Sequence, residues 1–463
     1  MERKNAWAAY AEDDSRVEAF AKAYCDFINN GKTERECVAY GEKLAKAHGF
    51  EDLNAVIRSG RKLEAGARVY VNWMGKSFML FVLGAKPLEE GMNILGAHID
   101  SPRIDVKQNP LYEDGDLAYL DTHYYGGIKK YQWVAMPLAL HGVIIKKNGE
   151  KVPVNIGEDE NDPVFCISDL LIHLAQEQMA KNAKDVVEGE ALNLIVGGRP
   201  LAGEEKDAVK ANVLKLLDDK YGVEEEDFLS AELEIVPAGK ARDMGFDRSM
   251  ILGYGHDDRV CAYPSMMAVL DYEGTPDYTL CCIITDKEEI GSVGATGMAS
   301  HYLENTVAEL YACTADYCEL VVRRCLRNSR MLSSDVSAGY DPNFASAFEK
   351  KNSAFLGRGI CFNKFTGSRG KSGSNDANPE FMASLRKIMD DAGVAFQTAE
   401  LGRVDLGGGG TIAYLCAKYG MNVIDSGIAV LSMHAPYEII SKVDLYEGYR
   451  CYCAFLKGAK PVD

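Results

Sequence analysis

Two adjacent glutamates, Glu288 and Glu289, stand where the chain could carry out acid–base and metal chemistry. They follow residues 278–284, an apolar run that predicts a buried strand, and they precede a glycine-rich turn. Adjacent side chains at the end of a strand point in different directions. One glutamate could therefore bind a cation while its neighbour moves a proton. Taken alone, the pair is also consistent with a solvated acidic loop.

Histidine and aspartate occur in similar settings at other points of the chain. His98 ends an expected strand and is followed by Asp100, which could accept a hydrogen bond from the second imidazole nitrogen. Asp335 and His434 follow two further expected strands, and Asp257 stands at the start of an expected helix. Singly, each has an ordinary explanation, because an aspartate at a helix start is often a cap and a lone histidine is often a core residue.

Together these residues form a candidate ligand set, because parallel strands bring their carboxyl ends to one edge of a sheet. Two imidazoles and three carboxylates suit a pair of zinc, cobalt or manganese ions. Two divalent ions carry four positive charges, whereas Asp257, Glu289 and Asp335 carry three negative ones. One hydroxide held by the ions would balance the site and could act as the nucleophile of a hydrolysis.

The elements that must position these side chains alternate between strand and helix in the first and last parts of the chain. Strands are expected at 69–73, 78–83, 93–99, 279–284, 330–334, 394–398 and 422–425. Helices are expected at 14–28, 33–48, 260–270, 297–303, 379–392, 412–419 and from 441 to about 457. Thr33 and Glu36 have the spacing of a capping box. The alternation predicts an α/β/α sandwich, whose mostly parallel central sheet is covered by helices on both faces.

Residues 104–247 have a different character and are expected to form an inserted, mainly-β domain. The catalytic domain would then consist of residues 1–103 and 248–463, which agrees with a chain too long for one hydrophobic core. Within the insert, helices are expected at 163–181 and 204–220, and a strand is expected at 231–236. Asn148 and Gly149 lie between two apolar runs and predict a hairpin with a type I′ turn.

Composition excludes several classes of partner. The formal net charge of −18 argues against nucleic acid and acidic membrane surfaces, because both are polyanions. The 13 cysteines are scattered without a Cys-x-x-Cys pair, which favours a reducing compartment, the cytoplasm. The first residues have no apolar signal core, and no apolar run approaches the roughly 20 residues of a spanning helix. We therefore expect a protein that is neither secreted nor embedded in a membrane.

Five motifs resemble, in order, those of the aspartyl aminopeptidase family of dinuclear zinc peptidases, from about residue 10 to the C-terminus. They are 96–103, 257–259, 286–291, 333–335 with 342–343, and 432–434. The resemblance implies that Asp257 bridges two metal ions, with zinc as the expected metal. It implies that His98 and Asp335 complete the coordination of one ion, and that Glu289 and His434 complete the coordination of the other. Glu288 would be the general base, and Asp100 is grouped with it as a catalytic residue.

The resemblance also implies that the insert forms dimers and that the dimers assemble into a tetrahedral dodecamer. The implied function is a cytoplasmic, metal-dependent aminopeptidase that releases N-terminal residues, preferably Asp or Glu, from peptides. Lys364, Arg369 and Lys371 are the local cations expected to bind an acidic side chain, and His173 is included with them as a substrate-binding residue. The ordinary meaning of such a basic run is a solvated surface loop.

Other functions are compatible with the same ligand set. An aminopeptidase of neutral or basic specificity, and a related dinuclear-metal carboxypeptidase or amidase, differ in the pocket that receives the substrate. A catalytically silent assembly protein could keep the fold, but here every expected ligand and Glu288 are present. Zinc is the expected metal, with cobalt and manganese as alternatives.

Overall fold

The chain, described over residues 4–462 in a computed structural model, forms two compact units. Unit 1 takes in the chain as far as Asp100, then Ala241–Met433 and the residues from Glu438 onward. Unit 2 consists of Ser101–Lys240 and the short segment His434–Tyr437. The expected boundaries fall after residues 103 and 247, and the assignment of catalysis to one part and dimerisation to the other stays a prediction.

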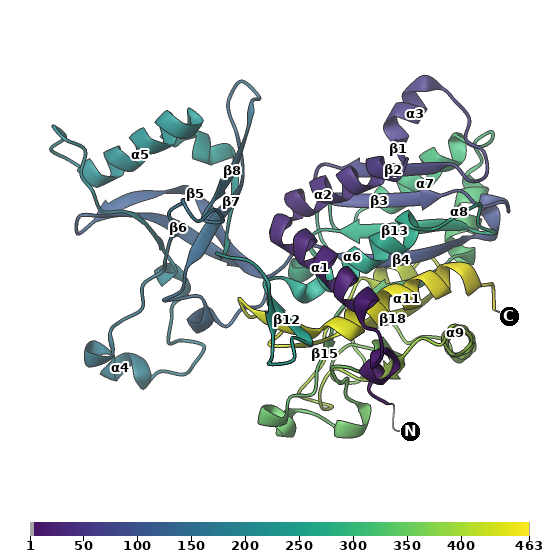
Figure 1. Cartoon of the computed structure of the whole chain (residues 1–463). Helices are drawn as coiled ribbons and strands as arrows, with labels where there is room; N and C mark the ends of the chain where they lie inside the picture. The colour runs from purple at the N-terminus through teal and green to yellow at the C-terminus, as the bar shows by residue number, and fades with distance from the viewer. Residues whose placement is uncertain (1–3, 463) are drawn as a thin grey trace. The chain divides into compact units, whose positions relative to one another are not determined.

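A nine-stranded sheet forms the centre of unit 1 (Figure 1). Five of its eight neighbouring strand pairs are parallel, as predicted for a mostly parallel sheet. In spatial order the strands are β1 (Glu51–Asp52), β2 (Arg68–Trp73), β3 (Ser77–Val82), β13 (Thr279–Thr285), β4 (Met92–His98), β14 (Arg330–Ser334), β18 (Asn422–Gly427), β16 (Ile360–Asn363) and β17 (Phe396–Thr398).

Helices cover both faces of this sheet, because its central strands are apolar on both sides. Leu95 and Leu332 pack into one core, whereas the alternating neighbours Ile94 and Met331 pack into the other. The first core also contains residues of α1 (Ser15–Asn30), α2 (Glu34–Ala47), α6 (His256–Leu270), α9 (Pro379–Ala392) and α11 (Lys442–Gly458). The second contains residues of α3 (Leu53–Ser59), α7 (Tyr302–Ala312), α8 (Glu319–Asn328) and α10 (Ala413–Ala417). The predicted α/β/α sandwich is confirmed.

The ends of these helices test the predicted caps. At the start of α2, the Thr33 hydroxyl accepts the N–H of Glu36 at 3.3 Å, and the Glu36 carboxylate accepts the N–H of Thr33 at 3.1 Å. The predicted capping box is therefore confirmed, and such a cap stabilises by about 1 kcal/mol. The helix expected from residue 441 is α11, which Ser441 precedes without a capping hydrogen bond from its side chain.

The helix expected at 297–303 is wrong in its bounds, since α7 begins only at Tyr302. Gly297 instead forms a parallel bridge with Asp286, and the N–H of Ala299 donates to the carbonyl of Ser292 at 3.1 Å. These contacts hold the segment as a series of turns, so helical periodicity in the sequence does not become a helix there.

A smaller five-stranded sheet completes unit 1. Its strands are β11 (Arg242–Met244), β12 (Met250–Gly253), β20 (Glu438–Ser441), β19 (Ala429–Leu431) and β15 (Ser337–Ala338). The strands are short and lie far apart in the sequence, so periodicity did not predict this sheet.

Unit 2 is built on a six-stranded antiparallel sheet, in agreement with a mainly-β insert. Its strands, in spatial order, are β8 (Lys151–Ile156), β7 (Leu138–Ile145), β10 (Ala231–Pro237), β5 (Arg103–Asp114), β6 (Leu117–Tyr125) and β9 (Leu194–Gly197). The helix α5 (Ala208–Tyr221) replaces the one expected at 204–220, and β10 is the strand expected at 231–236.

Two local predictions in this unit are wrong. Residues 163–181 do not form one helix: they contain a 3-10 turn at Ile172–Leu174 and the single turn α4 (Gln176–Met179). Their apolar side chains are largely exposed, so no core stabilises a longer helix. The β7–β8 hairpin forms, but its turn is not type I′, because only Gly149 has a positive φ, of 86°. The Asn148 side chain instead accepts the N–H of Glu150 at 2.9 Å.

Candidate metal centre

Three adjacent strand ends position most of the expected metal ligands. β13, β4 and β14 are neighbours and run parallel, so their carboxyl ends lie at one edge of the sheet. His98 is the last residue of β4, Asp335 follows β14, and the Glu288–Glu289 turn follows β13. Asp257 lies in the first turn of α6, where its backbone (φ −79°, ψ 108°) is not yet helical. Each ligand is thus placed by the end of a regular element.

The side chains converge into overlapping groups whose ligand atoms lie within 4.8 Å of one another. The groups are His98 with Asp257 and Glu289, His98 with Glu288 and Asp335, and Asp257 with Asp258 and Asp335. His98 Nε2 lies 3.3 Å from Asp257 Oδ1 and 3.9 Å from Asp335 Oδ1. Its distance to Glu288 Oε2 is 4.0 Å. Five of the expected site residues therefore meet at one place, and their individual roles stay predictions.

Asp100 orients both the histidine and the glutamate turn. His98 Nδ1 lies 2.9 Å from the backbone carbonyl oxygen of Asp100 and 3.3 Å from its Oδ1. The Asp100 carboxylate accepts the backbone N–H groups of Glu288 and Glu289, each at 3.1 Å. The expected partner of the imidazole is correct, although its carbonyl is closer than its carboxylate. Such a contact directs Nε2 towards the other carboxylates.

Like charges accumulate at this edge of the sheet. Burial raises the pKa of Asp335 well above its usual value, and the charge of Glu288 raises it further. Burial likewise raises the pKa of Asp258. For His98, burial lowers the pKa, but hydrogen bonds to Asp100 and Asp257 outweigh it and raise the pKa well above the ordinary value. Crowded carboxylates of this kind are stabilised by a nearby cation.

The donor set fits divalent metal ions. It combines an imidazole nitrogen with carboxylate oxygens, which are ligands that zinc accepts, and the oxygens carry an excess of negative charge. Asp257 and His98 belong to two of the three groups each, so neighbouring ions could share this region. The chemistry of the side chains therefore agrees with the resemblance to dinuclear zinc peptidases.

Two further carboxylates, which spacing did not identify, support the expected ligands. Asp258 Oδ2 accepts the backbone N–H of His98 at 3.3 Å, and Glu438 Oε2 accepts the backbone N–H of Asp257 at 2.9 Å. The neighbouring Asp257 was a signal for Asp258. Glu438 lies 181 positions from Asp257, so only the folded chain reveals it.

The remaining expected histidines are in unit 2. His434 lies in the short segment 434–437, where Nδ1 is 2.9 Å from the carbonyl oxygen of Gly127. His173 belongs to the 3-10 turn Ile172–Leu174 and lines a pocket of about 650 Å³ within that unit. Their roles as metal ligand and substrate-binding residue stay predictions.

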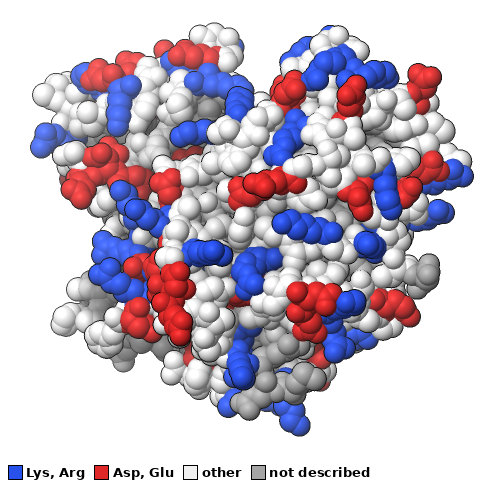
Figure 2. All heavy atoms as spheres, turned by 45° about the vertical axis from the view of Figure 1, so that its right-hand side comes forward, with Lys and Arg blue, Asp and Glu red and all other residues white. Residues whose placement is uncertain are grey.

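The expected substrate-binding cations are in loops of unit 1. Lys364 follows β16, and Arg369 and Lys371 line a pocket of about 300 Å³ together with Arg403. Lys371 Nζ lies 2.9 Å from Asp376 Oδ2 and 3.8 Å from the centre of the Phe365 ring, so its charge is already engaged. Acidic and basic side chains are interspersed over the face shown in Figure 2. Because the described residues of this face form no broad positive region, selection of an acidic substrate would depend on cations within the binding pocket itself.

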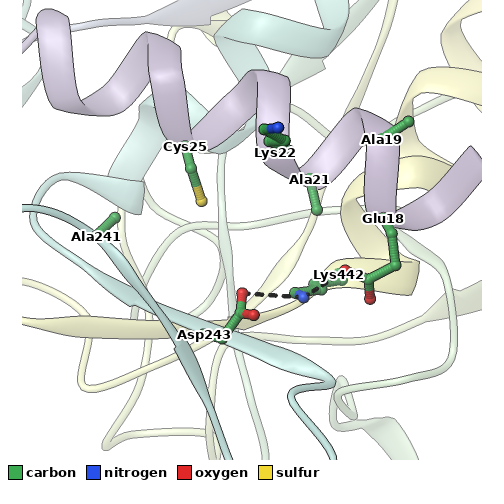
Figure 3. A pocket seen from close by; sticks show the side chains of 8 residues that line it. All are labelled: Glu18, Ala19, Ala21, Lys22, Cys25, Ala241, Asp243 and Lys442. Atoms are coloured by element: carbon green, nitrogen blue, oxygen red, sulfur yellow. Dashed lines mark hydrogen bonds and ion pairs between the residues drawn. The ribbon is translucent and has the colours of Figure 1, made fainter.

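A second pocket of unit 1, of about 420 Å³, lies beside α1 and the start of α11 (Figure 3). There Lys442 Nζ pairs with Glu18 Oε2 at 2.7 Å and with Asp243 Oδ1 at 3.0 Å. The burial of Lys442 explains this double pairing, because a buried ammonium requires compensating charge. We assign this pocket no chemistry.

Sequence comparison connects the chain to known proteins over nearly its whole length. A family model described as aminopeptidase I zinc metalloprotease (M18) matches residues 27–456. A probable M18 family aminopeptidase 1 of Clostridium acetobutylicum is 58% identical over 458 residues, or 98% of each chain. A protein of the same description from Borrelia garinii is 44% identical over 461 residues, which cover 99% of this chain and 100% of the relative.

Solved structures show the same relationship. The crystal structure of aminopeptidase I from Clostridium acetobutylicum has a TM-score of 0.92 at 56% identity and covers 98% of this chain and 99% of that one. That of an M18 aminopeptidase from Thermotoga maritima has a TM-score of 0.94 at 43% identity, covering 99% and 100%. The dodecamer of yeast mApe1 has a TM-score of 0.75 at 22% identity, covering 95% and 97%, which shows a shared fold. Across residues 4–462, no helix combines the length and apolar character needed to cross a membrane.

Proposed function

The chain belongs to the M18 family of zinc aminopeptidases, and from this membership we propose that it releases N-terminal amino acids, preferably Asp or Glu, from peptides. The observation that carries this proposal is the convergence of His98, Asp257, Glu288, Glu289 and Asp335 at the ends of adjacent strands. A silent assembly protein would have no need to keep such a cluster of like charges.

The residues would hold two divalent ions, with zinc as the expected metal. Asp257 would bridge the ions, His98 and Asp335 would complete one, and Glu289 and His434 would complete the other. When bound, the ions supply a Lewis acid that polarises the peptide carbonyl and makes water a better nucleophile. Asp100 fixes the imidazole of His98 and the turn of the two glutamates, so the ligands are oriented before an ion arrives.

Glu288 is the proposed general base. Its carboxylate is close to the ligands, 4.0 Å from His98 Nε2, and its backbone N–H is held by Asp100. From there it can take a proton from the attacking water and deliver that proton to the leaving amine. Glu289, the adjacent residue, lies in the other group around His98, together with Asp257, and is left to bind metal. This division of roles is the one that the two neighbouring glutamates suggest in the sequence.

A preference for acidic N-terminal residues would require a cation that binds the substrate's side-chain carboxylate. Arg369 is a better candidate for binding a substrate carboxylate than Lys371, because Lys371 already pairs with Asp376. Arg403 lines the same pocket and offers a second guanidinium, the group best suited to bidentate binding of a carboxylate. Lys364 and His173 complete the proposed set.

A substrate panel tests the proposed reaction. Free and N-acetylated p-nitroanilides of Asp, Glu, Leu and Lys would be incubated with the zinc-loaded protein, and release of nitroaniline would be followed. We expect hydrolysis of the free substrates, fastest for Asp and Glu, because an aminopeptidase requires a free amine. Hydrolysis of only the acetylated substrates would end the aminopeptidase proposal. Faster hydrolysis of Leu or Lys would replace the acidic specificity with a neutral or basic one.

We also propose that the protein is a cytoplasmic homo-oligomer, a dodecamer assembled from dimers. None of the 13 cysteines, all of which lie within residues 4–462, forms a disulfide, as expected in a reducing compartment. Unit 2 exposes Leu170, Leu171, Ile172, Leu174 and Met179 within ten residues, and exposed apolar clusters of this kind often mark protein interfaces. Yeast mApe1, which shares the fold, is described as a dodecamer.

Light scattering on the purified protein would measure the assembly. A particle of twelve chains is expected for the natural sequence, and Ile172→Asp should give smaller particles because it places a charge in the exposed apolar cluster. Leu320→Asp, which changes an exposed leucine of α8, is the matched control and should keep the large particle. A monomer in the natural protein would contradict the proposal.

A further inference from the structure

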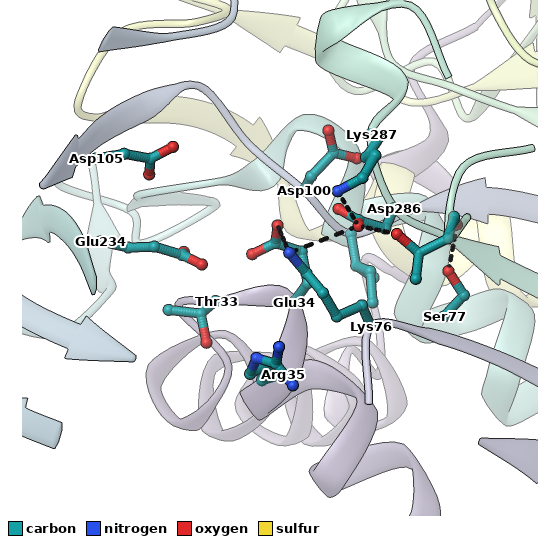
Figure 4. Close-up of polar contacts among 12 residues, drawn as sticks. Thr33, Glu34, Arg35, Lys76, Ser77, Asp100, Asp105, Glu234, Asp286 and Lys287 are labelled. Carbon is teal, nitrogen blue, oxygen red and sulfur yellow. Dashed lines mark hydrogen bonds and ion pairs between the residues drawn. The ribbon is translucent and has the colours of Figure 1, made fainter. Parts of the chain in front are cut away.

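Buried charges of both signs lie beside Asp286 and Lys287, the two residues that precede the Glu288–Glu289 turn (Figure 4). Lys76, in the turn between β2 and β3, is only 8% exposed, and its Nζ lies 3.8 Å from Glu34 Oε1 and 3.7 Å from Asp286 Oδ2. Glu34 and Asp286 are fully buried. The proposed chemistry uses neither Lys76 nor these two carboxylates, although burying three charged groups is unfavourable.

Lys76 is the cation that these two carboxylates share. Burial, followed by the charge of Glu34, raises the pKa of Asp286 to about 6, whereas the charge of Lys76 lowers it. Without the ammonium of Lys76, two buried carboxylates would repel each other in a medium of low polarity. Lys287 also donates to Asp286 Oδ2, at 2.9 Å, from a side chain that is partly exposed.

Asp286 closes the loop that contains the proposed general base. Its Oδ2 accepts the hydroxyl of Thr296 at 2.5 Å, and its backbone forms a bridge with Gly297. The hydroxyl of Ser77, next to Lys76, donates to the carbonyl of Thr296 at 2.6 Å. Asp286 therefore joins the two ends of the loop 286–297, and Ser77, the first residue of β3, holds the C-terminal end.

The loop needs such a closure because its backbone is unfavourable by itself. Lys287, directly before Glu288, has a φ of 68°, in the left-handed region that side chains other than glycine rarely adopt. Such a conformation persists only when surrounding contacts impose it. Asp100 constrains this backbone through the N–H groups of Glu288 and Glu289. Asp286, directly before Lys287, anchors the start of the loop through its contacts with Thr296 and Gly297.

We propose that Lys76 is a positioning residue for Glu288: it holds the Asp286 carboxylate in place, and Asp286 fixes the loop that presents the general base. This inference rests on the proposed function of Glu288. The ordinary alternative is a buried ion cluster that contributes only to the stability of the fold.

The test compares Lys76→Met with Lys76→Arg, because methionine keeps an apolar stem without charge and arginine keeps the charge. For Lys76→Met we expect kcat on a free N-terminal substrate to fall about tenfold or more, as small displacements of catalytic groups do. KM and zinc content should stay near those of the natural protein, and Lys76→Arg should recover most of kcat. Hydrogen exchange in the metal-free protein, measured by mass spectrometry, should become faster in loop 286–297 of Lys76→Met.

The peptide covering α9, which lies elsewhere in unit 1, is the internal control for exchange and should be unchanged. If the loop exchanges normally and activity falls only with the folded fraction, Lys76 has no positioning role. Should Lys76→Met fail to fold, Lys76→Gln, which removes the charge but keeps a polar group at this position, must give the same faster exchange. If the natural protein releases no N-terminal residues, the proposed function fails, whereas the exchange experiment still decides whether Lys76 orders the loop.

Discussion

Replacing Glu288 by glutamine is expected to lower kcat for a free N-terminal aspartyl substrate by about 10²-fold or more, the effect of losing a general base. Glutamine has nearly the shape of glutamate, but its amide cannot take a proton from water. The backbone contact of residue 288 with Asp100 does not depend on the side chain and should persist. Steady-state kinetics and elemental analysis of zinc on the same preparation would measure both properties.

Glu319→Gln is a suitable control for this variant, since Glu319 is an exposed residue at the start of α8. Its kcat and zinc content should match those of the natural protein. Near-normal activity of Glu288→Gln would remove Glu288 from the role of base. Loss of zinc together with activity would instead identify Glu288 as a ligand, a role that its proximity to His98 and Asp335 also permits.

Replacing His98 by alanine is expected to lower zinc content from two ions per chain to one or fewer. His98 belongs to two of the three ligand groups, and its Nε2 lies between Asp257 and Asp335. Without the imidazole, the ion proposed to be held by His98 and Asp335 would be left with carboxylate oxygens alone, which repel one another. Removal of even a supporting partner weakens metal binding by about 10–100-fold, so removal of a ligand should exceed that range.

Elemental analysis and competition with a chromogenic chelator would give the stoichiometry and affinity of zinc. His301→Ala is the matched control, because the side chain of His301 is 81% exposed and pairs only with Glu304 among the residues that the structure describes. It should retain two ions. If His98→Ala also retains two ions with natural affinity, His98 is not a ligand.

The strands that carry the site were predictable because their apolar runs are buried on both faces and stop at charged residues. β13, β4 and β14 all show this pattern, and parallel pairing follows from the alternation with helices. The helix predicted at 163–181 was wrong for the opposite reason. Most of its large apolar side chains remain exposed, so their spacing does not produce a long helix. The turn at Asn148 was expected to be type I′. The Asn148 side chain instead accepts the backbone N–H of Glu150 and stabilises a different turn.

For the site, the sequence identifies residues that carry chemistry but not those that hold them in place. His98, Asp257 and Asp335 have recognisable positions at element ends, whereas Glu438 reaches the N–H of Asp257 from a distant strand. Lys76 is a similar case, since nothing in the β2–β3 turn indicates that its ammonium joins two buried carboxylates. Contacts of this kind depend on tertiary packing and have no local pattern.

We expect one chain to hold two metal ions through these residues. A crystal structure of the zinc-loaded protein, with anomalous diffraction recorded at the zinc edge, tests it most directly. We expect two zinc peaks bridged by Asp257, one bound by His98 and Asp335 and the other by Glu289 and His434. Peaks located away from Asp257, or a His434 that binds neither ion, would contradict the account.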